Sequence, residues 1–92
     1  MIIHNAATAR EFVTAWSEAS PRRRALHFKI ARDGQSLAAG MAYLRNDRKG
    51  ENAHRAAMRV LHMAEREVLC SILGWSVECV ATVAELWEEV GK

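Results

Sequence analysis

The chain has 92 residues, half of them hydrophobic and 26% charged, with a formal net charge of +2. This length corresponds to a single domain, residues 1–92, with enough apolar residues to form a core without a metal or disulfide bonds. The sequence has no apolar run of the roughly 18–20 residues that a membrane span needs, and Met1, Ile2 and Ile3 are too few for a signal peptide. We therefore expect a cytoplasmic protein in its host cell, with no membrane contact and with Cys70 and Cys79 reduced.

Charge is distributed unevenly along the chain. Between Arg22 and Arg66 there are eleven Lys and Arg residues and four acidic residues, a local charge of +7. From Ser76 onward there are four Glu and one Lys, a local charge of −3. A basic region followed by an acidic tail indicates either internal neutralisation or a basic surface for an anionic partner.

The first predicted element is a helix over residues 6–19. Thr8 and Glu11 have the spacing of a capping box, and the apolar residues that follow recur at helical intervals. Ser20 precedes Pro21 and ends the helix, because a residue before proline avoids helical angles. Ile2 and Ile3 are candidates for an edge strand.

Residues 25–44 are predicted to form a β-hairpin, with Asp33-Gly34 as a two-residue turn. Pairing outward from this turn places the large apolar side chains on one face, as a strand period of two requires. These residues, expected in the core, are Leu26, Phe28, Ile30, Leu37 and Met41. The alternative is an all-α domain of five helices, in which two short helices meet at Asp33-Gly34.

The second half of the chain is predicted to be helical. Residues 45–50 are polar and indicate a loop, and an apolar helical pattern then covers residues 51–73 and ends at Gly74. Ser76 is the expected N-cap of a short last helix over residues 76–90. Together with the hairpin, these elements predict an α+β fold.

Metal and catalytic motifs are not evident. His54 and His62 are eight residues apart, too far for a ligand pair on one helix, and no Cys-x-x-Cys motif or glycine-rich phosphate loop occurs. Cys70 and Cys79 lie in apolar sequence, which is typical of unreactive thiols. We expect no metal, no cofactor and no enzymatic activity.

Basic residues give the strongest functional signal. Arg55, Arg59, His62 and Arg66 share one face of the predicted long helix. Either the acidic face of the last helix neutralises them, or they stay open to phosphates or to an acidic protein surface. Both alternatives remain open at this point.

A second basic cluster flanks the predicted hairpin. A triplet of arginines precedes its first strand and three further cations follow its second strand, so the open end of the hairpin would bring the two groups together. This cluster is either a solvated rim or an anchor for an anionic backbone. The candidate partner-binding residues are Arg22, Arg23, Arg24, Arg45, Arg48, Lys49, Arg55, Arg59 and Arg66.

Residues 69–80 contain a pattern that resembles the helix-turn-helix family. It consists of Leu69, a Leu73-Gly74 pair, Ser76 and Val80. The second helix of that motif would carry glutamates toward the phosphate backbone, which is electrostatically unfavourable for binding in the major groove.

The predicted hairpin of residues 28–40, the basic loop and the Ala-rich helix over residues 53–64 resemble the core of several small phage anti-CRISPR proteins. They are also similar to the second half of a double-stranded-RNA-binding domain, although that family has three strands before its last helix. The first resemblance implies a stoichiometric inhibitor that binds a CRISPR effector complex and has no catalytic residues.

We therefore expect a non-enzymatic binding protein, an inhibitor from a phage or mobile element that contacts a nucleoprotein complex through its basic surface. A small regulator that binds nucleic acid directly is the first alternative. A homodimeric interaction module is the second.

Overall fold

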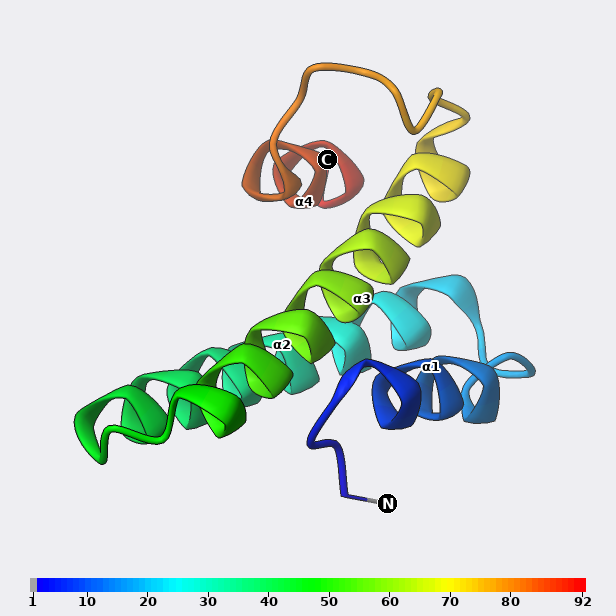
Figure 1. Cartoon of the computed structure of the whole chain (residues 1–92). Coiled ribbons are helices and arrows are strands. Elements are labelled where there is room, and N and C mark those ends of the chain that lie inside the picture. The colour runs from blue at the N-terminus through cyan, green and yellow to red at the C-terminus, as the bar shows by residue number, and fades with distance from the viewer. Residues whose placement is uncertain (1) are drawn as a thin grey trace.

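The structure of residues 2–92, a computed structural model, consists of four helices. They are α1 (Ala6–Ala15), α2 (Pro21–Leu44), α3 (Arg48–Leu73) and α4 (Val83–Val90) (Figure 1). No strand occurs among residues 2–92. The predicted α+β fold is therefore wrong, and the all-α alternative fits, with four helices in place of five.

The predicted hairpin is a single helix, α2, which continues through Asp33 and Gly34. Pro21 occupies its first turn, where a missing N–H costs nothing. Alanines, the best helix formers, face α3, with Ala25, Ala39 and Ala42 buried. These preferences and the contact with α3 outweigh the cost of about 1 kcal/mol that a glycine imposes inside a helix.

The last two helices differ from expectation at their boundary. Gly74 ends α3 in the left-handed conformation, with φ of 71°, as predicted for this glycine. Ser76 does not cap a helix, because the chain stays non-helical until Thr82, whose side chain accepts a hydrogen bond from the Glu85 N–H. Residues 74–82 thus form a loop too long for the three- to four-residue turn of a helix-turn-helix motif.

The N-terminus also differs from the sequence prediction. Asn5, and not Thr8, is the N-cap of α1, and Thr8 completes the capping box from the third helical position. Ile3 forms no strand. Its carbonyl accepts a hydrogen bond of 2.9 Å from Gln35 Nε2, which ties the N-terminal segment to α2.

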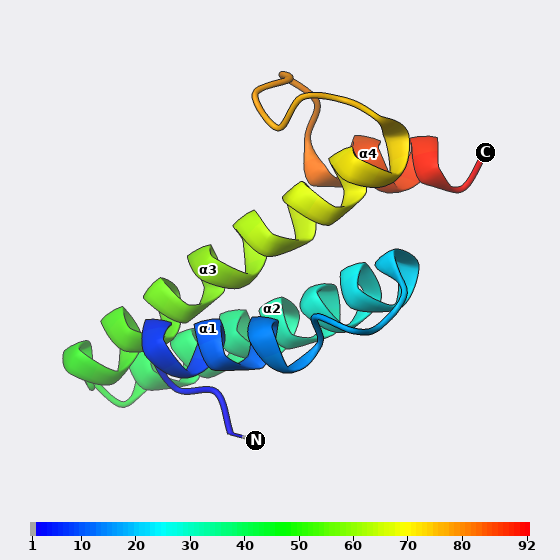
Figure 2. The same cartoon turned by 90° about the vertical axis from the view of Figure 1, so that its right-hand side faces the viewer.

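Helix α3 contacts each of the other three helices (Figures 1 and 2). It runs antiparallel to α2, and the two helices diverge away from their short connection (Figure 2). Leu61 packs with Ala9 of α1, whereas Leu69 packs with Leu86 of α4 and with Phe28 of α2. The core therefore follows α3 along its length.

A buried carboxylate connects α2, α3 and α4. Glu65 of α3 is fully buried, and its Oε1 accepts a hydrogen bond of 2.7 Å from Arg32 Nε of α2. Its Oε2 accepts a hydrogen bond of 2.6 Å from the indole Nε1 of Trp87 in α4. Because an unpaired buried charge is strongly destabilising, these two donors stabilise the position of both helices against α3.

Replacing Gly34 tests whether α2 is continuous. A Cβ at Gly34 meets no atom within 4 Å, so Gly34→Ala should stabilise the protein by about 0.5–1 kcal/mol through helix propensity. In a hairpin turn the same position would need a positive φ, and alanine would destabilise it. Urea unfolding at one fixed protein concentration measures the difference.

Gly74→Ala is the matched control, since φ of 71° is strained for alanine. We expect it to lower the free energy of unfolding by about 1 kcal/mol. A fall in stability in Gly34→Ala, to the same extent as in Gly74→Ala, would contradict a helix through Asp33-Gly34.

Candidate functional site

His27, His54 and Cys70 lie in contacts within the fold of residues 2–92. No group of three or more His, Cys, Asp or Glu side chains is placed there to hold a metal ion. The ring of His27 stacks on Trp16 with centroids 3.8 Å apart, and His54 Nδ1 lies 2.8 Å from Gln35 Oε1. Burial and, secondly, the neighbouring Cys79 raise the pKa of the Cys70 thiol, which disfavours its nucleophilic thiolate form.

Arg66, one of the predicted partner contacts, is used by the fold. Its guanidinium donates hydrogen bonds to the carbonyl oxygens of Val77 (3.0 Å), Ala81 (2.6 Å) and Cys79 in the loop between α3 and α4. The planar guanidinium thereby fixes an otherwise irregular segment. The C-terminal glutamates that we considered as its partners do not contact it.

Two further predicted contacts stabilise the start of α2. Arg24 Nη1 donates to the carbonyl of Ala19 at 2.9 Å, and Arg22 Nη2 donates to that of Val90, in α4, at 3.3 Å. Arg23 is exposed beside them. The predicted meeting of this arginine triplet with the cations of residues 45–49 does not occur, because the 24-residue helix α2 separates them by about 35 Å.

The other predicted cations gather where α2 passes into α3, and we call them the basic edge. The connection is tight, with Asn46 in the left-handed conformation, φ 58°. Along α3, Arg48, Arg55 and Arg59 follow one another at intervals of seven and four residues, which places these three on one face about 16 Å long. The basic edge consists of Arg45, Arg48, Lys49, Arg55 and Arg59, all exposed.

The nearby acidic groups leave most of this charge uncompensated. Asp47 uses its carboxylate to cap α3, where it accepts a 2.9 Å hydrogen bond from the Gly50 N–H. Glu51 pairs with Arg55 Nε at 2.9 Å, a surface ion pair of small energy. The other four side chains of the basic edge make no hydrogen bond or ion pair with residues 2–92.

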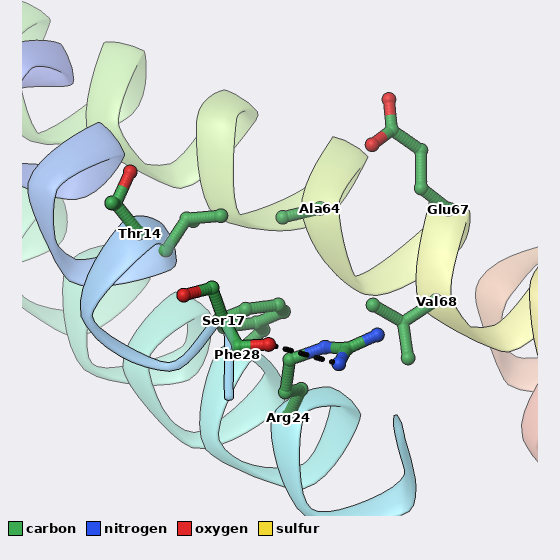
Figure 3. Close-up of a pocket in the computed structure, with 8 residues that line it drawn as sticks. Thr14, Ser17, Arg24, Phe28, Ala64, Glu67 and Val68 are labelled. Carbon is green, nitrogen blue, oxygen red and sulfur yellow. Dashed lines mark hydrogen bonds between the residues drawn. The ribbon is translucent and has the colours of Figure 1, made fainter. Parts of the chain in front are cut away.

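An open hollow of about 420 Å³ lies between α1, α2 and α3 (Figure 3). Phe28 and Val68 line it, and Arg24 and Glu67 lie at its sides. Arg24 Nη1 also donates to the Ser17 carbonyl at 3.5 Å, shown as the dashed line. Its other lining residues are Val13, Thr14, Ser17 and Ala64.

Sequence reasoning missed an apolar surface on α2, which we call the outer stripe. Four of its five side chains, those of Leu26, Ile30, Leu37 and Met41, were expected in the core, yet all five are exposed. Their spacing of four, seven, four and three residues is that of one helix face and was visible in the sequence. The outer stripe consists of Leu26, Ile30, Leu37, Met41 and Leu44, with exposed fractions of 47%, 58%, 68%, 50% and 79%.

Comparison with known proteins assigns the chain to no family. No family model, curated protein or solved structure significantly matches the chain. No helix in residues 2–92 is long and apolar enough to cross a bilayer.

Removing Arg66 should destabilise the fold, because three loop carbonyls are left without their donor. We expect Arg66→Ala to lower the free energy of unfolding by about 1–3 kcal/mol. Arg59→Ala, which removes an exposed and unpaired arginine, should change it by no more than about 0.5 kcal/mol. Equal effects of the two substitutions in urea unfolding would show that Arg66 has no structural role.

Proposed function

We propose that this protein acts in the cytoplasm as a non-catalytic binding protein, which contacts a nucleoprotein complex through the basic edge. The observation that carries the proposal is the uncompensated charge of Arg45, Arg48, Lys49 and Arg59. Cations without an internal partner are the groups that neutralise phosphates and release their counterions. We do not propose Arg66, Arg22 and Arg24 as partner contacts, because their side chains form hydrogen bonds within the fold.

The distribution of acidic residues supports contact with an anionic partner through the basic edge. Glu85, Glu88 and Glu89 belong to α4, whose last residue, Val90, accepts a hydrogen bond from Arg22 at the start of α2. The acidic helix therefore lies toward the end of α2 opposite to the basic edge. A molecule with separated charges approaches an anionic partner with its basic end first.

Inhibition of a CRISPR-type complex is the most specific form of this proposal. The hairpin on which the resemblance depended is absent from residues 2–92, so this form now depends on the basic edge alone. It predicts that the protein lowers target-DNA binding by a purified effector complex. It also predicts that neutralising the basic edge restores that binding.

Neutralising the tip of the basic edge should reduce both affinity for phosphates and its salt dependence. The test variant combines Arg45→Gln, Arg48→Gln and Lys49→Gln. For a short DNA duplex we expect weak binding by the natural chain, with a dissociation constant of about 10⁻⁴–10⁻⁶ M. The slope of log affinity against log salt should become shallower by about 0.9 for each phosphate that the variant no longer neutralises. Fluorescence anisotropy across a salt series measures both quantities.

A control variant with the same change in net charge combines Arg10→Gln, Lys29→Gln and Lys92→Gln, at positions outside the basic edge. It should retain the natural slope. If the slope becomes equally shallow in both triple variants, the basic edge is not a specific surface. Binding to naked duplex as tight as to any complex would instead indicate a regulator that binds nucleic acid directly.

A further inference from the structure

Apolar side chains occupy both faces of α2. The face toward α3 carries three buried alanines, Ala25, Ala39 and Ala42, together with the larger buried residues Phe28 and Gln35. The opposite face carries the outer stripe, from Leu26 to Leu44, a length of about 27 Å. Five exposed apolar side chains follow this helix face, interrupted at Asp33 and Gly34, and exposed apolar patches of this size are often interaction sites.

We propose that the outer stripe is the interface of a homodimer, in which α2 packs antiparallel against α2 of a second copy. The area is sufficient. At the observed exposed fractions the five side chains present roughly 500 Å² per copy, so a symmetric pair buries on the order of 1,000 Å², near the lower limit for specific interfaces.

In this arrangement, residues along the stripe of one copy lie opposite residues of α2 in the second copy with which they can pack. With the two-fold axis near residues 35 and 36, Ile30 lies opposite Met41 of the second copy, and Leu26 lies near its Leu44. Leu37 lies opposite Gly34, where a Cβ would meet no atom within 4 Å and the backbone is open to a close approach. Leu37 thus faces a glycine and Ile30 faces the flexible side chain of Met41, as in a ridge that enters a groove, and the two leucines meet at the ends of the contact.

Charge selects the antiparallel orientation. Asp33 lies beside the stripe, with a side chain 56% exposed, and pairs with Lys29 Nζ at 3.4 Å on its own helix. In a parallel pair this charged pair would face its equivalent on the second copy, and four charges would be desolvated together beside an apolar contact. In the antiparallel pair Asp33 lies near Ala38 of the second copy, displaced along the axis from its equivalent.

The ends of the interface have a predictable dependence on salt. Arg23 of one copy comes near Arg45, Asp47 and Arg48 of the other, whose net charge is positive, so the ends of the interface repel. Added salt should therefore strengthen the dimer, whereas it weakens any binding to phosphates. The dimer also extends the basic edge with an arginine from the second copy, which the monomer places about 35 Å away.

Leu37→Glu tests the interface, because the side chain is 68% exposed and we therefore expect the substitution to leave the monomer fold intact. By sedimentation equilibrium, the natural chain should show twice its mass of 10.3 kDa, falling toward the monomer mass on dilution. Leu37→Glu should remain monomeric at every concentration, with unchanged far-ultraviolet circular dichroism. Met63→Glu, at an exposed methionine on α3, is the control and should dimerise normally.

Cross-linking tests the orientation. In a chain with Cys70→Ala and Cys79→Ala, an oxidised mixture of Leu26→Cys and Leu44→Cys should form mixed disulfide dimers. Either variant cross-linking mainly with itself would overturn the antiparallel arrangement.

Three other outcomes would overturn the homodimer. They are a natural chain that stays monomeric, a dimer that survives Leu37→Glu, and a monomer that binds a different protein through the stripe. The salt slope for duplex DNA is a separate measurement. If dimerisation fails and that slope still depends on the basic edge, the proposed function stands without the dimer.

Discussion

The buried carboxylate of Glu65 is the interaction on which the arrangement of the helices depends. It lies within the core, so its charge must be compensated by groups that the neighbouring helices bring to it. Arg32 of α2 and Trp87 of α4 do so, at 2.7 Å and 2.6 Å. Neither helix can rotate about its axis without removing a donor from this carboxylate.

The two proposed surfaces follow from this constraint. Because Arg32 and Phe28 face α3, the residues half a turn away must face outward, and those are the apolar residues of the outer stripe. The small alanines on the inner face let α2 and α3 approach closely along their antiparallel contact. The short connection between them then projects Arg45, Arg48 and Lys49 from one end of the molecule.

Much of the helical content could be predicted from the sequence, and the hairpin error has a clear physical origin. Periodicity located most of α3 and its end at Gly74 because the apolar spacing and the glycine indicate the same boundary. In residues 25–44 the apolar positions fit two patterns equally well. They lie on one face of a β-hairpin that turns at Asp33-Gly34, and they also lie on two faces of a single α-helix. Local preference alone could not decide between them, because the contacts that α2 makes with α3, such as Arg32 with Glu65, join residues far apart in sequence.

The basic residues were predicted as a set, but their roles depend on tertiary structure. Arg59 and Arg66 share a face and a spacing in the sequence, yet one is exposed and the other holds the loop of residues 74–82. That loop was predicted as helix because Ser76 resembles an N-cap. The carbonyls of this loop instead accept hydrogen bonds from the Arg66 guanidinium. The periodicity of the sequence cannot reveal this arrangement.

A double-mutant cycle between Arg32 and Glu65 tests the central constraint most directly. The free energy of unfolding is measured for Arg32→Ala, for Glu65→Gln and for the chain with both changes. A buried, coupled pair predicts that Arg32→Ala alone costs about 3–5 kcal/mol and that the cycle gives a coupling energy of about 2–3 kcal/mol. Effects of the two substitutions that add to within about 0.5 kcal/mol would contradict the role assigned to this carboxylate.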